Sequence, residues 1–154
     1  MKSLQVQNGD LVTSSGSLVF AQGSTKLVQA LTLWLKEPLS GIPSVGPGFT
    51  TPSFGSVLES YIGQSNIGLM QTQVKGEVLR ILGLYGQTQL SQLQKAQTVG
   101  SLNYWDKSEI IQRVISIDVS STTNQITASV AIQTLASNTL SLDIIVGQNG
   151  ITVV

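Results

Sequence analysis

The chain has 154 residues, of which 41% are hydrophobic and 10% are charged, and its formal net charge is +0. A typical soluble domain carries about 25% charged residues, so a surface this poor in charge favours association with other proteins. Cysteine and histidine are both absent, which excludes disulfides, cysteine nucleophiles, Ser-His-Asp triads and histidine-based metal sites. We therefore expect a single domain over residues 1–154 that is not an enzyme and that holds no cofactor or metal.

The sixteen charged residues, eight basic and eight acidic, are scattered along the chain without a run of like charge. No basic stripe is available to neutralise phosphates, so we expect no nucleic-acid partner. No run of about 18 apolar residues occurs, and the first ten residues turn polar too early for a signal peptide. We expect no membrane segment, and synthesis and assembly in the cytoplasm.

The start of the sequence predicts a β-hairpin. Asn8-Gly9 suits a two-residue type I′ turn between two short alternating segments. With that turn, Val6 lies opposite Leu11 and Leu4 lies opposite Thr13.

A helix is expected next. Ser24 or Thr25 is the predicted N-cap, and Pro38 ends the helix after Glu37. The glycine- and proline-rich segment 41–48 follows a helix and lacks the Gly-Lys-Ser/Thr ending of a phosphate-binding loop, so it is interpreted as a surface loop.

Two further helices are predicted from apolar residues at helical spacing. One is short and covers residues 54–62, with Phe54 and Tyr61 as core residues. The other covers about residues 72–97, and Gly83 with Gly86 predicts a kink or break near Gly86 because glycine weakens a helix.

The last third of the sequence alternates apolar and polar residues in the way that half-buried strands do. Strands are predicted over 115–119, 126–132 and 140–146, and Asn149-Gly150 predicts a turn before an edge strand or tail at 151–154. Short connections favour antiparallel pairing. The predicted fold class is α+β: an N-terminal β-hairpin, and two to three helices packed on a small, mainly antiparallel C-terminal sheet.

Two sets of residues stand out from this background. Arg113 lies among strongly apolar residues, where arginine either pairs with a carboxylate, crosses an interface, or extends from a sheet edge into solvent. The uncharged segment 151–154 either pairs with a partner's strand or completes the chain's own sheet. Asp106 and Glu109 are too isolated for a metal site and are expected to be solvated.

The ordered segments together resemble the sheath-initiator, or baseplate wedge, family of contractile phage tails and related injection machines. The resemblance rests on the hairpin around Asn8-Gly9-Asp10-Leu11-Val12, on Glu37-Pro38-Leu39-Ser40-Gly41 at the end of the first helix, and on Thr51-Pro52-Ser53-Phe54-Gly55-Ser56-Val57-Leu58. Members often carry Glu-Pro-Arg where the first long strand begins. Here that stretch is Ile111-Gln112-Arg113, so only the arginine matches.

The resemblance implies a structural subunit of the tail baseplate, in the virion. Its partners would be other wedge proteins, the tail sheath protein whose first ring it templates or anchors, and the hub or tube proteins. The expected partner-binding residues are Gln112, Arg113, Ile151 and Val153. The alternatives are a receptor- or carbohydrate-binding virion module, for which aromatic residues are few, and a small tail hydrolase, for which no catalytic pair is present.

Overall fold

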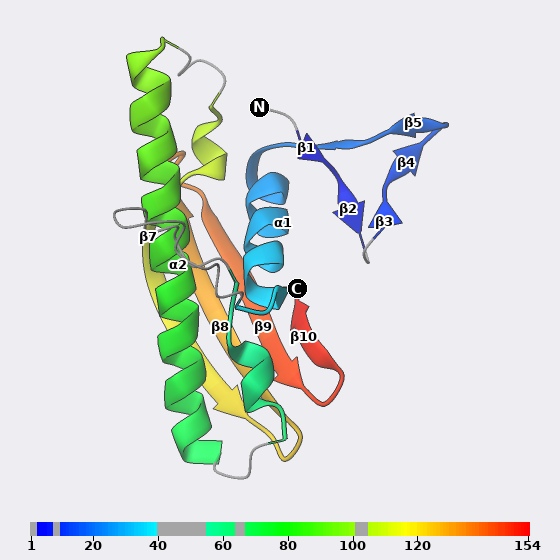
Figure 1. Ribbon diagram of the computed structural model, residues 1–154, viewed down its shortest axis with the longest axis vertical. Helices are drawn as coiled ribbons and strands as arrows, with labels where there is room; N and C mark the ends of the chain where they lie inside the picture. Colours follow the sequence, from blue (N-terminus) through cyan, green and yellow to red (C-terminus); the bar gives the residue numbers. More distant parts are fainter. Residues whose placement is uncertain (1–2, 8–9, 40–54, 64–66, 101–104) are drawn as a thin grey trace, which may run out of the picture.

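The structure, a computed structural model, describes residues 3–7, 10–39, 55–63, 67–100 and 105–154. The predicted Asn8-Gly9 turn, the predicted loop 41–48 and Phe54 lie outside these residues. The fold is α+β, as predicted, with small β-hairpins first, then two α-helices, then an antiparallel sheet (Figure 1).

The C-terminal sheet has four strands in the order β10-β9-β8-β7, and every neighbouring pair is antiparallel. The strands are β7 (Ile111–Ser121), β8 (Gln125–Thr134), β9 (Thr139–Gly147) and β10 (Gly150–Val153). The three predicted strands are confirmed. The segment after the last turn completes the chain's own sheet, because β10 pairs with β9 from Gly150↔Gly147 to Val153↔Ile144.

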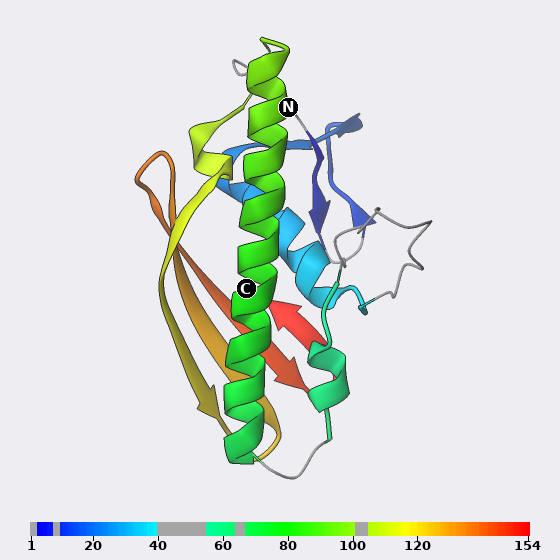
Figure 2. The same ribbon diagram turned by 60° about the vertical axis from the view of Figure 1, so that its left-hand side comes forward.

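Two α-helices cover one face of this sheet (Figures 1 and 2). They are α1 (Gly23–Lys36) and α2 (Ile67–Thr98), and short 3-10 helices occur at η1 (Leu58–Tyr61) and η3 (Lys107–Glu109). The prediction of a full helix over 54–62 is wrong, because the described part of that segment is helical only in η1.

The predicted break in α2 near Gly86 is also wrong, since α2 continues without interruption. Gly83 is exposed, and a Cβ added at Gly83 or Gly86 would meet no other atom within 4 Å. Each glycine costs the helix about 1 kcal/mol relative to alanine. Burial of the apolar stripe of α2 offsets that cost: Val74, Val78 and Ile81 are fully buried.

A distant carboxylate, and not the predicted Ser24 or Thr25, caps the N-terminus of α1. The N-cap residue is Gln22, which makes no side-chain cap bond. Instead, the Gly23 N–H donates to Glu109 Oε1 at 3.2 Å, and Lys26 Nζ lies 2.6 Å from Glu109 Oε2. Glu109 is therefore buried and paired, which corrects the expectation that it is solvated.

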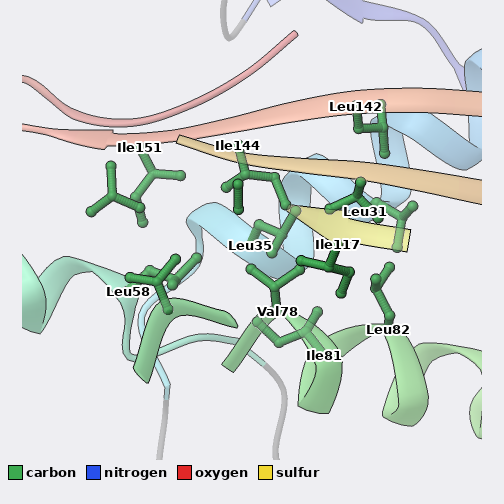
Figure 3. Packing of buried hydrophobic residues seen from close by; sticks show 14 of the residues in the cluster. Leu31, Leu35, Leu58, Val78, Ile81, Leu82, Ile117, Leu142, Ile144 and Ile151 are labelled. Atoms are coloured by element: carbon green, nitrogen blue, oxygen red, sulfur yellow. The ribbon is translucent and has the colours of Figure 1, made fainter. Parts of the chain in front are cut away.

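One hydrophobic core fills the space between the helices and the sheet. In Figure 3 the labelled side chains of α1, η1, α2 and the strands point toward one another. Leu31, Leu35 and Leu58 are fully buried, and Ile151 of β10 belongs to the same cluster. Tyr61, predicted as a core residue, is partly buried and packs at the margin of this core. Trp34 also packs at the margin, and it meets Tyr85 edge-to-face at a centroid distance of 5.7 Å. Apolar burial of this extent is the main source of stability.

The N-terminal segment folds into a triangle of three short strand pairs that projects beyond α1 (Figure 1). The pairs are β1 (Ser3–Leu4) with β6 (Phe20–Ala21), β2 (Val6–Gln7) with β3 (Asp10–Leu11), and β4 (Thr13–Ser14) with β5 (Ser17–Leu18). The predicted Val6↔Leu11 pair is confirmed. The predicted Leu4↔Thr13 pair is wrong, because Leu4 pairs with Phe20.

Backbone bonds between three residues close the triangle. The Gln5 N–H donates to the Val19 carbonyl, the Val19 N–H to the Val12 carbonyl, and the Val12 N–H to the Gln5 carbonyl, at 2.8–3.0 Å. The Gln29 side chain of α1 holds the triangle to the body, accepting from the Val6 N–H at 3.0 Å and donating to the Leu4 carbonyl at 2.8 Å. The pairing of the predicted hairpin therefore ends at Gln5, and Leu4 pairs with Phe20 and not with Thr13.

A partly buried ion pair anchors the segment that precedes η1. Arg80 Nη2 lies 2.7 Å from Glu77 Oε1, Arg80 also donates to the Gly55 carbonyl, and Glu77 accepts from the Val57 N–H. Burial acts to raise the pKa of Glu77, but the hydrogen bonds from Arg80 and Val57 and the charge of Arg80 together hold this pKa below its ordinary value.

We expect the Glu77 pair to make stability sensitive to acid. Since the folded-state pKa is lower than the unfolded-state pKa, the contribution of Glu77 is fully present above the unfolded pKa and is lost as pH falls through the folded pKa. Glu77→Gln should therefore be less stable than wild type at neutral pH and should lose less stability between about pH 5 and pH 2. Urea unfolding at several pH values measures how the free energy of unfolding changes with pH in wild type and in Glu77→Gln. Equal slopes would contradict the assignment.

Candidate functional site

The four residues predicted to bind partners lie on opposite edges of the sheet. Gln112 and Arg113 belong to the edge strand β7, whereas Ile151 and Val153 belong to the other edge strand, β10. The structure therefore does not bring them together. They define two separate candidate surfaces.

The β10 edge presents unpaired backbone groups. Val154 and Asp143 exchange two backbone hydrogen bonds, at 2.8 and 3.0 Å. In an antiparallel pair such residues alternate with pairs that exchange none, so the N–H and C=O groups of Ile151 and Val153 point away from β9. No described residue hydrogen-bonds to these groups. The Ile151 side chain is buried, so its contact with a partner would be made through the backbone.

The β7 edge differs from the β10 edge because its register is interrupted twice. Shifts lie between Ile111 and Arg113 and between Val114 and Ser116. Each leaves one residue, Gln112 or Ile115, without a partner on β8. Such bulges twist an edge strand and prevent regular pairing with another strand. At the start of β7, contacts with a partner would therefore be made by side chains, whereas the register is unbroken from Ile117 to Ser121.

Arg113 is exposed on the edge strand β7, which is the third of the arrangements expected for it: a side chain that extends from a sheet edge into solvent. Its Nε donates to Gln133 Oε1 on β8 at 2.7 Å. Within the described residues Arg113 forms no ion pair. The remaining guanidinium N–H groups can therefore donate to an acceptor from another chain.

Arg113 and Gln112 line a groove of about 490 Å³ between α2 and the start of β7. The described residues that line it include no acidic side chain. The apolar ones are Leu79, Leu82, Leu90, Leu93, Ile110, Ile111 and Val114. Leu79 and Leu90 are 46% and 57% exposed, which is unusual for leucines that share one concave surface.

The groove wall is fixed by a buried glutamine of α2. Gln89 Nε2 donates to the Glu109 carbonyl at 2.6 Å, and Gln89 Oε1 accepts from the Ile111 N–H at 3.0 Å. These two bonds hold the start of β7 beside α2 and satisfy backbone groups that would otherwise be unpaired there. The positions of Gln112 and Arg113 follow from this attachment.

The motif residues around Gly55 have a structural role. The Ser56 N–H donates to the Glu37 carbonyl, the Leu39 N–H donates to the Ser56 carbonyl, and Ser56 Oγ donates to the Leu35 carbonyl. Gly55 has φ +97°, and an added Cβ would lie 2.6 Å from the Pro38 carbonyl oxygen. The described parts of the two sequence motifs, residues 37–39 and 55–58, therefore meet at the end of α1 and fix its exit.

A smaller cleft of about 210 Å³ lies where η1 meets the turns at the end of the sheet. It is lined by hydroxyl and amide side chains, including Thr122, Asn124 and Gln125, and by Tyr61. A carbohydrate site usually offers an exposed aromatic ring, but Tyr61 packs against the core. Burial, followed by the nearby Glu77 charge, raises the pKa of Tyr61, so its hydroxyl stays protonated at neutral pH.

The sequence did not lead us to predict that the N-terminal triangle has an exposed apolar face. Because paired residues share a face and neighbours alternate, one face carries a set of exposed side chains, namely Leu4, Val6, Leu11, Thr13, Leu18 and Phe20. The signal that predicts the triangle is a seven-residue repeat, with leucine at 4, 11 and 18 and glycine at 9, 16 and 23.

The described part of the chain contains no cluster of three or more acidic side chains that could hold a metal ion. Among the same residues, no helix has both the length and the apolar character needed to cross a membrane. No protein-family model, curated protein or solved structure matches the chain.

Proposed function

We propose that this chain is a structural subunit of a contractile-tail baseplate, which binds wedge proteins and anchors or templates the first ring of the sheath protein. The observation that carries the proposal is the β10 edge, where the backbone groups of Ile151 and Val153 point outward without a partner among the described residues. A partner strand in antiparallel register would exchange two hydrogen bonds with each of these residues. The role is binding, and no catalysis is proposed.

Three further features support an assembly role. Charged residues make up only 10% of the chain, so like-charge repulsion between neighbouring subunits is weak. The apolar face of the N-terminal triangle leaves five large apolar side chains 39–49% exposed, and exposed apolar patches are typical of protein interfaces. The tail context comes from the resemblance at residues 37–41 and 51–58.

Val153→Pro tests the β10 edge without removing β10 itself. The substitution deletes an outward-pointing N–H and leaves the hydrogen bonds to β9 in place. An edge strand tolerates proline at such a position because the missing N–H does not belong to the sheet's own hydrogen bonds. We expect it to retain the fold and to lose binding to the purified sheath protein of the same tail. Binding is measured by co-sedimentation: baseplates that carry the variant are mixed with sheath protein, and the sheath that assembles on them sediments with the baseplates.

Two controls complete this experiment. Val153→Ala removes most of the side chain but keeps the N–H, so it should bind sheath protein as wild type does. Thr152→Pro removes an N–H that faces β9 and should cost about 1–3 kcal/mol of stability, because the acceptor on β9 loses its donor. Normal sheath assembly with Val153→Pro would rule out strand addition at this edge.

A further inference from the structure

The C-terminal half of β7 presents backbone groups that point away from the chain's own sheet. The Thr122 N–H donates to the Gln125 carbonyl at 2.9 Å, so these two residues are a hydrogen-bonded pair where β7 turns into β8. Because bonded and non-bonded pairs alternate along an antiparallel ladder, the N–H and C=O groups of Ile117, Val119 and Ser121 face away from β8. No described residue hydrogen-bonds to these groups. β7 is the edge strand on this side of the sheet (Figure 2).

This segment is complementary to itself. Ile117 and Ser121 lie two residues before and two residues after Val119, so a second, antiparallel copy can be placed with a two-fold axis at Val119. Ile117 then lies opposite Ser121 of the other copy, and Val119 lies opposite its own counterpart. Each of these pairs exchanges two hydrogen bonds, which uses every outward-pointing group of the segment. The bulge at Ile115 and the turn after Ser121 limit the contact at its two ends.

The polar side chains on the open face of the sheet favour the same register. Ser129 Oγ of β8 donates to Asp143 Oδ1 of β9 at 2.7 Å. Because the backbone of Ser129 is bonded to β7, Ser129 and Asp143 exchange no backbone hydrogen bonds, and their side chains lie close together. With the axis at Val119, the exposed Asp118 of each copy faces the exposed Ser120 of the other at a position of the same kind. An axis at Asp118 would instead oppose two carboxylates and form one backbone pair fewer.

We propose that two copies of this chain pair through residues 117–121 of β7 about a two-fold axis at Val119. The product is one continuous antiparallel sheet with four strands from each copy. Because each copy uses the same edge, the contact is closed and association stops at the dimer. The formal net charge of +0 produces no overall repulsion between the copies. The inference does not rest on the proposed function, and it leaves a β10 edge free at each end of the combined sheet.

Sedimentation equilibrium of the whole chain tests the dimer. Since the interface is small, we expect wild-type dimers to form between about 10 µM and 1 mM. Ser120→Asp places a carboxylate opposite Asp118 of the other copy, twice in each dimer, and should weaken association about tenfold or more. Ser116→Asp is the matched control, because it adds the same charge at the same spacing from Asp118 but outside the paired segment. It should dimerise as wild type does.

A charge of the opposite sign should have the opposite effect. Ser120→Lys places an ammonium group opposite Asp118 of the other copy, so it should strengthen association by roughly three- to thirtyfold. Added salt should reduce this gain, because the two groups are exposed to solvent.

Val119→Pro tests the backbone contact at the axis. It removes an N–H that points away from β8, which an edge strand tolerates, and it places the proline ring where the two strands meet. We expect a folded monomer at every concentration, with the fold checked by circular dichroism. Val119→Ala keeps the N–H and should still dimerise. If Val119→Pro does not fold, the comparison of Ser120→Asp with Ser116→Asp still decides the question.

Three results would overturn the proposal. One is a wild-type chain that stays monomeric up to about 1 mM. Another is a dimer that keeps its wild-type affinity in both Ser120→Asp and Val119→Pro. The third is a dimer that Val153→Pro weakens and Ser120→Asp does not, which would assign the contact between copies to β10. Sheath binding is measured separately, so each of the two proposals can fail without the other.

Discussion

Removal of residues 148–154 should leave a chain that is largely unfolded at room temperature. These residues include all of β10, and the Ile151 side chain is part of the core. Loss of one buried isoleucine costs roughly 2–5 kcal/mol, and the truncation also removes the packing of Val153 and every hydrogen bond between β10 and β9. We expect a total of about 5 kcal/mol or more, comparable with the whole stability of many domains.

Circular dichroism with urea unfolding measures this effect. Val154→Ala is the matched control, because the Val154 side chain is 67% exposed and its loss should change stability by less than about 0.5 kcal/mol. A truncated chain with the wild-type unfolding midpoint would contradict the placement of β10 in the core. If the truncation unfolds the chain, its failure to assemble says nothing about an interface, and Val153→Pro is then the informative variant.

The C-terminal sheet could be predicted because one of its faces is buried. Ile126, Ala128, Val130 and Ile132 alternate with more exposed residues, and this periodicity is visible in the sequence. The pairing of β10 could not be predicted, because a short apolar segment satisfies its backbone equally well against its own sheet or against a partner's. Its pairing with the chain's own sheet is decided by the core, in which the Ile151 side chain is buried.

Helix ends and polar partners were harder to predict because they depend on residues far apart in the chain. Ser24 is a better cap by type than Gln22, yet the acceptor for Gly23 comes from Glu109, 86 positions away. The continuity of α2 through Gly86 depends on packing that local propensity does not contain. Two of the four predicted binding residues, Gln112 and Arg113, line a groove. The groove itself could not be predicted from the sequence, because its other wall is α2 and the position of α2 relative to β7 depends on the packing.

Glu109→Ala should destabilise the domain by about 2–4 kcal/mol, because it removes three connections at once. The Gly23 N–H loses its acceptor, Lys26 loses a carboxylate 2.6 Å away, and the N-terminus of α1 loses a negative charge. The effect falls below the upper limit for buried pairs because the Lys26 side chain is 21% exposed. Asp106→Ala is the control, since Asp106 is exposed and accepts from the Ser108 N–H in η3.

Glu109→Gln separates the cap from the ion pair. The amide oxygen can still accept from the Gly23 N–H, so the variant should retain protection of that amide from hydrogen exchange while it loses the pair with Lys26. The Ile111 amide reports on the groove wall through Gln89, which also donates to the Glu109 carbonyl. If Glu109 fixes the start of β7, Glu109→Ala should speed exchange at Ile111 more than at Ile144, in the middle of the sheet. Equal changes at both amides would show that Glu109 contributes only to global stability and does not position Arg113.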